Sequence, residues 1–453
     1  MINIINQLIK KLNKKQSTTD KQGGNNTQKT NHKIEEEKGM KFIQKKEYEK
    51  AEEIFRGIVR NEPSSPTAYG LLGAACGMQG KLDLMKKYSQ MAIDLNDQYP
   101  MAHNNLGYAL EREGLSNEAI VHFKLALKLK PKYVDCHVNL GLALLKSGDY
   151  INGWSHYEWR LLSNKYNRLK AIPPCPQFSG GSLKGKQLLI VYEQGLGDVI
   201  QCMRFVNFLK SHGVTCSFCA PKKLHRLIQT SDIDPSPLTW EEANTITDGQ
   251  WMPLFSIPRY LCFGPDNPAN NQPYIRSSIA LTSKWERILN KENKFTVGIN
   301  WSGNRKDKDK LGRNIPVDQF NALADIDQIQ LLSLQRRPAA TPTWVSDQLI
   351  NIQNQIDQII NSDDADDFLE YAAIIENCDL IITCATTTAH LAAGMGKPTW
   401  VMLEKVPDWR WGLEGNSTFW YPTMRLFRQT NQGEWHHVIK KIKESLLKHL
   451  SSS

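Results

Sequence analysis

Small residues and one carboxylate stand where an apolar run of the chain gives way to a helical pattern. The segment EQGLGD (193 to 198) follows the run QLLIVY and carries Gly195, Gly197 and Asp198. Glycines at these positions allow a tight turn and close approach to the backbone, and Asp198 falls in the first turn of the helix that follows. There it either contributes to a ligand site or caps the helix, a role worth about 1 kcal/mol.

A second segment has the same design. DLIITCATTTAHLAAGMGK combines an apolar run, a turn of small residues and a helical pattern. Thr386, Thr387 and Thr388 offer hydroxyl and N–H groups to a phosphate, and His390 falls in the first helical turn. His390 is either a phosphate contact or a structural histidine.

Polar residues also follow two further apolar runs. TVGINWSGN ends in a polar turn that includes Asn304, and LLSLQ ends with Gln335, whose amide is able to read a base or a ribose. The charged loop at 305 to 316 either meets a diphosphate or is simply solvated. These turns therefore offer groups that a phosphate, a base or a ribose would contact.

Several common sites are missing from the sequence. No GxxxxGK[ST], GxGxxG or HExxH motif occurs, and no DxD pair stands at the end of a predicted strand, so we expect neither a metal nor a bound cofactor. The nine cysteines are scattered through apolar segments, as is typical of reduced thiols in a cytoplasmic protein. The single CxxC, Cys216 and Cys219, lies in a strand-like run and is interpreted as buried rather than as a zinc or redox site.

Two α/β blocks are needed to position these turns. Apolar runs alternate with helical patterns from 186 to 290 and again from 291 to 432, which is typical of parallel sheets with crossover helices. Ligands of such sheets bind at the carboxyl ends of the strands, so the two blocks predict a cleft between two facing α/β domains. A terminal helix and tail fill 433 to 453.

A helical repeat precedes these blocks. Glycines recur every 34 residues at Gly39, Gly73, Gly107 and Gly141, and this period predicts about four tetratricopeptide (TPR) repeats over 32 to 167. The second repeat is looser in sequence. The repeats form either a peptide-binding groove or a packing platform. A linker rich in proline and glycine follows at 168 to 185.

Charge and hydropathy exclude some classes of protein. Residues 1 to 31 are predicted to be a disordered basic tail; through residue 34 there are seven lysines and one aspartate, leaving +3 of the net +9 charge for the remainder. This remainder does not indicate nucleic-acid binding. No apolar stretch approaches the ~20 residues of a membrane span. The basic amphipathic segment 1 to 15 either is a frayed tail or touches a membrane surface.

Taken together, these motifs resemble a known architecture. EQGLGDVIQ, GINWSGN, SLQ, TTTAHLAAGMGKPTWV, PDWRW and WYPTMRLFRQ, with GWSHYEWR before them, resemble bacterial TPR proteins that carry a glycosyltransferase domain. That domain is similar to glycosyltransferase family 9, the heptosyltransferases, and more remotely to O-linked N-acetylglucosamine transferase. The resemblance implies a GT-B fold of two Rossmann-like domains, with the acceptor on the first (186 to 290) and the nucleotide-sugar donor on the second (291 to 432). It also implies an inverting, metal-independent transfer of a hexose or heptose from the nucleotide-sugar to a protein or glycan hydroxyl.

The resemblance also implies roles for single residues. Asp198 matches the proposed general base, Arg313 the basic phosphate-binding residue, and Thr386 to His390 the phosphate-binding turn. Trp409, Arg410 and Trp411 either line the donor side or form a packed corner in which the cation stacks on the rings. Ala385 stands where many relatives have an aspartate before the first threonine, which removes the usual contact to the donor sugar.

Two other functions stay open. One is a peptide-binding TPR scaffold whose catalytic domain has decayed, which Ala385 and the loose second repeat favour. The other is a nucleotide-sugar epimerase, which would not need the repeats.

Overall fold

The computed structural model describes residues 26–267, 273–289, 294–303, 313–335, 350–361 and 367–452. The chain divides into two compact units. The first is helical and takes the chain up to Asn167 together with Asp408–Leu413; the second is α/β and takes Arg168–Pro407 and Glu414–Ser453.

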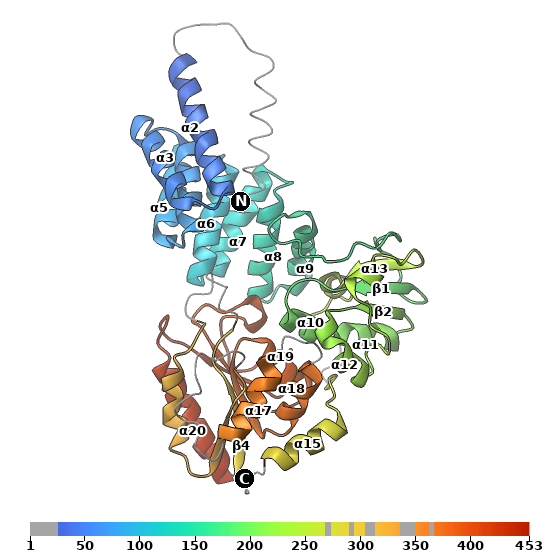
Figure 1. Ribbon diagram of the computed structural model, residues 1–453. Helices are drawn as coiled ribbons and strands as arrows, with labels where there is room; N and C mark the ends of the chain where they lie inside the picture. Colours follow the sequence, from blue (N-terminus) through green and yellow to red (C-terminus); the bar gives the residue numbers. More distant parts are fainter. Residues whose placement is uncertain are drawn as a thin grey trace. The chain divides into compact units, whose positions relative to one another are not determined.

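The helical unit is a TPR solenoid, as the glycine period predicted. Each helix packs against the next along the chain (Figure 1). The helices are α2 (Asn26–Gln44), α3 (Tyr48–Asn61), α4 (Pro66–Met78), α5 (Leu82–Leu95), α6 (Pro100–Glu113), α7 (Ser116–Leu129), α8 (Val134–Lys146), α9 (Tyr150–Tyr157) and η1 (Glu158–Leu162). Helix α2 begins at Asn26, inside the segment predicted to be a tail, because extending a helix that the repeats already anchor costs little.

The repeated glycines mark the places where paired helices cross closely. A Cβ added at Gly107 would lie 2.8 Å from Cε1 of Phe123, and one at Gly141 would lie 2.6 Å from the backbone N of Tyr157. These contacts explain why the small and the aromatic positions share the 34-residue period. Larger residues at the glycines would force the helices apart.

The second repeat packs differently, in line with its looser sequence. Ser89 occupies the position that is aromatic elsewhere, and its Oγ would lie 3.1 Å from a Cβ at Gly73. Met85 compensates, because its Sδ would lie 2.3 Å from a Cβ at Gly77. Both side chains are fully buried, so the flexible methionine fills the space that the missing ring leaves.

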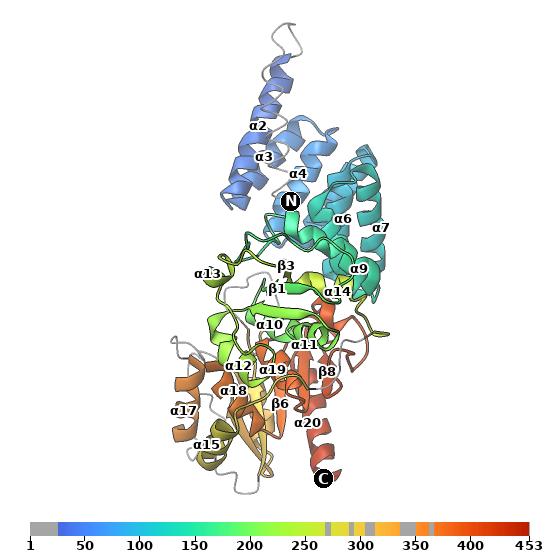
Figure 2. The ribbon, with the colours of Figure 1, turned by 90° about the vertical axis from the view of Figure 1, so that its right-hand side faces the viewer.

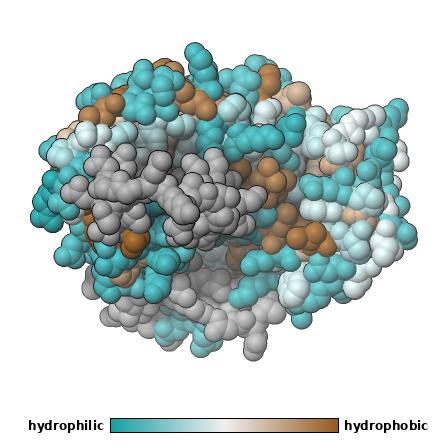
Figure 3. Space-filling model, turned by 90° about the horizontal axis from the view of Figure 1, so that it is seen from above, coloured by the Kyte–Doolittle hydropathy of each residue, from teal (hydrophilic) through white to brown (hydrophobic). Residues whose placement is uncertain are grey.

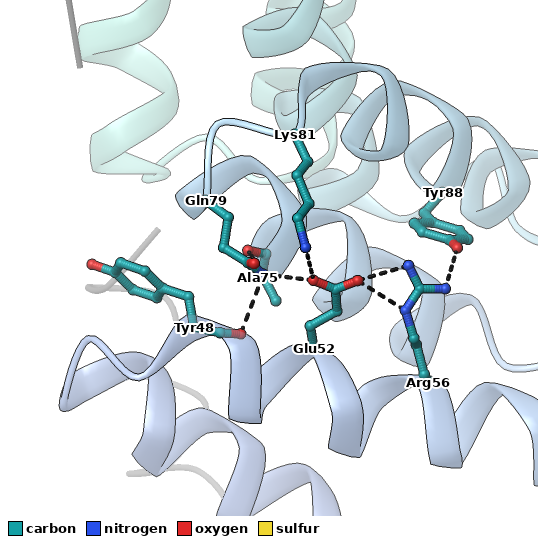
Figure 4. A network of polar contacts seen from close by, with 7 residues as sticks. All are labelled: Tyr48, Glu52, Arg56, Ala75, Gln79, Lys81 and Tyr88. Carbon is teal, nitrogen blue, oxygen red and sulfur yellow. Dashed lines mark hydrogen bonds and ion pairs between the residues drawn. The ribbon is translucent and has the colours of Figure 1, made fainter. Parts of the chain in front are cut away.

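A polar network ties the first repeat to the second (Figure 4). The buried carboxylate of Glu52 accepts hydrogen bonds from Arg56 (2.7 and 2.8 Å), Gln79 (2.7 Å) and Lys81 (2.7 Å). Arg56 also donates to the hydroxyl of Tyr88 at 2.7 Å. Although burial acts in the opposite direction, the hydrogen bonds from Lys81, Arg56 and Gln79 lower the pKa of Glu52 to about 2. The ionised form is therefore the one that the fold stabilises.

The α/β unit contains two parallel sheets, which confirms the predicted fold class (Figure 2). The smaller sheet has the order β2-β1-β3, with β1 (Gln187–Val191) between β2 (Thr215–Cys219) and β3 (Gln250–Pro253). Its helices are α10 (Leu196–Cys202), α11 (Arg204–Ser211), η2 (Lys222–Leu224), α12 (His225–Thr230), α13 (Trp240–Ala243), η3 (Leu254–Ser256) and α14 (Ile257–Tyr260).

The larger sheet has the order β5-β4-β6-β7-β8. Its strands are β4 (Phe295–Asn300), β5 (Ile329–Ser333), β6 (Leu380–Cys384), β7 (Thr399–Leu403) and β8 (Met424–Arg428). The neighbouring helices are α15 (Ile279–Leu289), η4 (Val317–Phe320), α16 (Asn321–Ala324), α17 (Ile350–Asn361), α18 (Asp367–Glu376), α19 (Thr387–Gly394) and α20 (His436–Ser452). The apolar residues of α20 and of alternate strand positions form one core on one face of this sheet.

Helix α15 belongs with the larger sheet, although its sequence lies in the first α/β block. Trp285 is buried, and its Nε1 donates to Oε1 of Glu370 on α18 at 3.2 Å. Lys284 pairs with the same carboxylate. The chain therefore passes from the smaller sheet to the larger sheet before α15 begins.

Candidate functional site

Strand order marks one switch point in each sheet. β1 lies between β2 and β3, and β4 lies between β5 and β6, so the next strand of the chain lies on one side of β1 or β4 and the strand after it lies on the other side. Ligands of parallel sheets bind outside the carboxyl ends of the strands at such switch points. The segment EQGLGD follows β1 and the segment TTTAH follows β6. We therefore take the two turns as the candidate site.

A buried polar cluster fixes the turn after β6. Thr386 donates from Oγ1 to Oδ1 of Asn300 at 3.0 Å, and Thr383 reaches the same oxygen at 3.3 Å. The two threonine hydroxyls lie 3.1 Å apart. Asn300 is the last residue of β4, so this cluster joins the ends of the two strands that flank the switch point. The Thr386 hydroxyl therefore helps to hold the turn after β6 against the end of β4.

The other predicted phosphate contacts of this turn differ in exposure. Thr388 is buried, and its Oγ1 lies 2.8 Å from the hydroxyl of Tyr371. His390 is buried, and its Nδ1 lies 3.0 Å from the hydroxyl of Tyr421. Thr387 begins α19 and is only half-buried. Thr387 is accordingly the threonine best placed to meet a ligand.

The turns after β1 and β6 meet at Gly197. A Cβ there would lie 3.3 Å from Cα of Thr387 and 3.3 Å from Cδ2 of His390. The glycine therefore permits the start of α10 to touch the start of α19, which brings the positive ends of two helices together.

Asp198 acts as a helix cap. The backbone N–H of Gly195 donates to its Oδ2 at 2.9 Å, and the side chain is half-buried. The preceding Glu193 is fully buried, and its Oε1 accepts from the backbone N of Phe255 at 3.2 Å. Glu193 thus joins the end of β1 to the end of β3.

Arg313 lies at the carboxyl edge of the larger sheet. Its Nη2 would lie 2.6 Å from a Cβ at Gly303, in the turn after β4. Burial raises the pKa of the Cys384 thiol at the end of β6 to about 11, and the nearby Arg313 guanidinium acts against this shift. Within the described part of the chain, Nε of Arg313 is buried without a hydrogen-bond partner. An orphaned donor on a cation beside the switch point suits an anionic ligand.

Gln335 is engaged by the protein backbone. Its Oε1 accepts from the backbone N of Trp301 at 3.2 Å and of Ser302 at 2.8 Å, and it lies 3.3 Å from Nδ2 of Asn300. This oxygen therefore shapes the turn after β4. Asn304, the neighbouring residue predicted from sequence, lies outside the described residues.

Trp409, Arg410 and Trp411 form a packed corner of the helical unit. All three are buried in η6 (Trp409–Trp411), and Asp408–Leu413 belongs to that unit. The Arg410 guanidinium stacks 4.4 Å from the Trp409 ring, which meets Trp154 of α9 edge to face at 5.2 Å. The segment therefore belongs to the helical unit and forms the packed corner with a stacked cation that was one of the two interpretations of the sequence. Apolar and aromatic burial decides the placement.

A buried network that sequence reasoning missed supports His390. Arg204 is buried between the rings of Tyr274 (4.6 Å) and Tyr421 (4.5 Å), and it donates to the Trp420 carbonyl at 2.7 Å. Tyr274 donates to the Ile200 carbonyl at 3.0 Å, and the two tyrosine hydroxyls lie 3.3 Å apart. An arginine flanked by the apolar residues Met203 and Phe205 was the signal available in the sequence.

Metal-ligating side chains and cysteines occur throughout the described part of the chain. No group of three or more His, Cys, Asp or Glu side chains there is arranged to hold a metal ion. The cysteines form no disulfide. Burial raises the pKa of Cys216 to about 11 and that of Cys219 to about 12, as expected of thiols inside a sheet.

One family model matches part of the helical unit. Residues 102–133 match the family model described as tetratricopeptide repeat. The repeats are tetratricopeptide repeats. Among solved structures, similar chains include MamA (23% identity, TM-score 0.26, 28% of this chain and 75% of that one), YrrB, a TPR protein with an unusual peptide-binding site (20%, 0.25, 29% and 67%), and the Arabidopsis OM64 TPR domain (21%, 0.23, 24% and 89%).

The match to one curated relative is longer than the repeat region. The chain is 23% identical over 320 residues to protein FlbA of Caulobacter vibrioides. The match covers 65% of this chain and 52% of FlbA. The chain therefore spans about half the length of this relative.

The surface carries scattered apolar side chains. On the face shown in Figure 3, hydrophobic residues occur in small groups among hydrophilic ones. Exposed examples elsewhere in the chain include Ile151 on α9 and Ile279 on α15. Among the described helices, none combines the length and the apolar character that crossing a membrane requires.

Proposed function

We propose that the α/β unit transfers a hexosyl or heptosyl group from a nucleotide-sugar to a hydroxyl group of a protein or glycan, and that the TPR repeats recruit the acceptor or a partner. The observation that carries the proposal is the contact between Gly197 and Thr387. It brings the turn that bears Asp198 against the helix start that suits a diphosphate. An acceptor and a donor held at these two turns would be neighbours.

In the proposed reaction, the acceptor is activated at the turn after β1 and the donor is held at the turn after β6. The acceptor hydroxyl oxygen attacks C1 of the donor sugar, and its proton passes to the carboxylate of Asp198. The bond between C1 and the diphosphate oxygen breaks, and the nucleoside diphosphate leaves with the bonding electrons. Attack from the face opposite the leaving group inverts the anomeric centre.

Stabilisation of the leaving group falls to Arg313 and to the start of α19. A diphosphate gains negative charge as the bond breaks, so a guanidinium and unpaired helix N–H groups favour the transition state. The buried Nε of Arg313 that lacks a partner supports this role. Thr387, half-buried at the helix start, contributes a hydroxyl and a backbone N–H.

The repeats supply the means of recruitment. Stacked TPR helix pairs form extended surfaces that bind peptides. Such a surface brings an acceptor protein to the enzyme at a raised local concentration. We therefore expect the acceptor, or an adaptor that carries it, to be a polypeptide.

A panel of UDP-, GDP- and ADP-sugars tests the proposal. Calorimetry on the full chain identifies the donor, and nucleotide release is then measured with and without candidate acceptors. Release that depends on an acceptor is the expected result. Isomerised sugar without transfer would indicate an epimerase instead.

A scaffold with a decayed catalytic domain is the second candidate. It is favoured by Ala385, and by the use of one Asp198 oxygen as a helix cap. Donor binding without release under all acceptor conditions would support it.

A further inference from the structure

The hydroxyl group of Tyr421 connects His390 to a network built on a buried cation. Its oxygen lies 3.0 Å from Nδ1 of His390 and 3.3 Å from the hydroxyl oxygen of Tyr274. The side chains of His390, Tyr421, Tyr274 and Arg204 are all buried. A hydroxyl group carries one proton, so Tyr421 donates either to His390 or to Tyr274.

Tyr274 gives its own proton to the backbone. Its hydroxyl group donates to the carbonyl oxygen of Ile200 at 3.0 Å, and a carbonyl oxygen only accepts. The oxygen of Tyr274 also accepts from Nη2 of Arg204 at 3.2 Å. Tyr274 therefore has no proton left for Tyr421, and its oxygen already accepts from a cation. Nδ1 of His390 is the nearer acceptor for Tyr421, and we assign the proton to that contact.

The proton of Tyr421 fixes the tautomer of His390. An Nδ1 that accepts a hydrogen bond carries a lone pair, and in a neutral imidazole the proton is then on Nε2. Burial raises the pKa of Tyr421 well above its ordinary value, so the hydroxyl group keeps its proton at physiological pH. His390 is therefore a hydrogen-bond donor at Nε2.

Arg204 holds the Tyr421 ring in this position. Its guanidinium carbon lies 4.5 Å from the centre of the Tyr421 ring and 4.6 Å from that of the Tyr274 ring. It also donates to the carbonyl oxygens of Trp420 at 2.7 Å and Gln201 at 2.9 Å. Burial of a cation is costly, and in the described part of the chain no carboxylate pairs with Arg204. The ring faces and the carbonyl oxygens offset that cost, so they are held close to the guanidinium.

The Nε2 edge of His390 faces the place where the two turns meet. Cδ2, which is bonded to Nε2, would lie 3.3 Å from a Cβ at Gly197. The hydroxyl oxygen of Thr387 would lie 3.3 Å from the same Cβ. Nε2 of His390 and the hydroxyl group of Thr387 therefore flank one point near the start of α19, where the N–H groups of the first helical turn favour an anion.

We propose that Tyr421 is a positioning residue: its hydroxyl group holds His390 in the tautomer whose Nε2–H donates a hydrogen bond to the diphosphate of the nucleotide-sugar. This inference rests on the proposed function. No proton is transferred, and the hydrogen bond strengthens as the diphosphate gains negative charge while its bond to C1 breaks. In the other tautomer the lone pair of Nε2 would face the diphosphate oxygens and repel them. Tyr421 therefore decides whether His390 attracts or repels the leaving group.

Nitrogen NMR of the full chain, labelled at histidine, measures the tautomer in the absence of any ligand. The signals of His390 are those that vanish in His390→Gln. A proton on Nε2 and none on Nδ1 is the expected result, and a proton on Nδ1 would overturn the proposal. The measurement needs no substrate, so its outcome does not depend on whether the protein transfers a sugar.

Calorimetric titration with inorganic pyrophosphate tests the contact to the anion. The amide nitrogen of glutamine reaches about as far as Nε2 of histidine, whereas that of asparagine reaches only about as far as Nδ1. His390→Gln should keep the pyrophosphate affinity within about threefold, and His390→Asn should weaken it by roughly 10- to 100-fold, the effect of losing a hydrogen bond to a charged group. Equal affinity of the two variants, or no binding to the wild-type chain, would overturn the proposal. Pyrophosphate binding without turnover of any nucleotide-sugar would instead contradict the proposed function and leave the His390 contact in place.

Turnover separates positioning from stability. Tyr421→Phe should lower kcat by about 3- to 10-fold, the rate equivalent of one neutral hydrogen bond. Val438→Ala is the control, because Val438 is buried in the core beside the larger sheet and its truncation lowers stability without touching the network. This control should keep the wild-type kcat. No fall in kcat in folded Tyr421→Phe, or an equal fall in both variants, would overturn the positioning role.

Discussion

The backbone N–H of Gly195 donates to Oδ2 of Asp198 at 2.9 Å. One oxygen of the carboxylate thus caps α10, and the same side chain is the base of the proposed reaction. The cap fixes the orientation of the carboxylate, which general-base catalysis needs. The two roles can be separated by replacing one oxygen with an amide.

Asp198→Asn should abolish turnover and leave donor affinity nearly unchanged. The asparagine oxygen still accepts the Gly195 N–H, so the helix start is preserved, but the amide cannot take a proton. A fall of at least about 100-fold in kcat is expected, with the donor Kd changed less than about twofold. Calorimetry and a nucleotide-release assay measure the two effects. Turnover that survives the substitution would move the base to Glu193 or His390.

Arg313→Ala should chiefly weaken donor binding. Hydrogen bonds to charged groups contribute about 1.5–3 kcal/mol, so the donor Kd should rise by roughly 10- to 100-fold. Arg287→Ala on α15 is the matched control, because that side chain is exposed and its loss removes the same charge. An unaltered donor Kd in Arg313→Ala would remove this residue from the site.

Tyr421→Phe should destabilise the α/β unit. The substitution removes a buried hydroxyl that lies 3.0 Å from Nδ1 of His390 and 3.3 Å from the hydroxyl of Tyr274. Leaving such groups unsatisfied costs about 1–3 kcal/mol, measurable by urea unfolding. Tyr192→Phe is the control, because in the described part of the chain the Tyr192 hydroxyl makes no hydrogen bond. Equal stability of both variants would show that the network contributes nothing.

Glu52→Gln should destabilise the TPR unit by at most about 3 kcal/mol. The folded-state pKa of Glu52, about 2, is below its usual value of 4.5. Its stabilisation is therefore fully present above pH 4.5 and is lost as the pH falls toward 2. Unfolding measured between pH 7 and pH 2 should show the difference between wild type and Glu52→Gln shrinking with acid. The exposed neighbour Glu53→Gln should show neither effect.

Gly141→Ala should separate the helices of the fourth repeat. The new Cβ would meet the backbone N of Tyr157 at 2.6 Å and the carbonyl oxygen of Gly153 at 3.0 Å, and backbone atoms cannot rotate away. Overpacking of this kind costs about 1–3 kcal/mol. Gly57→Ala on α3 is the matched control, since nothing lies within 4 Å of its Cβ, and alanine there should stabilise by up to about 1 kcal/mol. Equal melting temperatures would contradict the close crossing.

Local pattern was enough to predict most of the secondary structure. The apolar runs QLLIVY, TVGINW, QLLSLQ, DLIITCA and TWVML correspond to β1, β4, β5, β6 and β7. They are readable because a buried parallel strand must be apolar on both faces. The helical run after EQGLGD was read as one element, whereas the structure divides it at Met203 into α10 and α11.

Candidate residues were found by type, but their partners were not. Thr386 and Gln335 follow the ends of β6 and β5, and their side chains hold the turns together. Thr388 lies in the first turn of α19, and its side chain contacts Tyr371 of α18. The position of a strand end in the sequence predicts which residues reach the edge of a sheet. It does not predict whether the side chains of those residues already form hydrogen bonds with a neighbouring strand.

The sequence by itself determined the TPR period and the two parallel α/β blocks, because both follow from local spacing of glycine and apolar residues. Only the tertiary structure decided that Trp409 belongs to the repeats, and that Arg204 donates to the carbonyl of Trp420, 216 residues away. Such contacts depend on strand order and helix crossing, which bring distant segments together. Periodicity along the chain carries no information about which distant groups will meet.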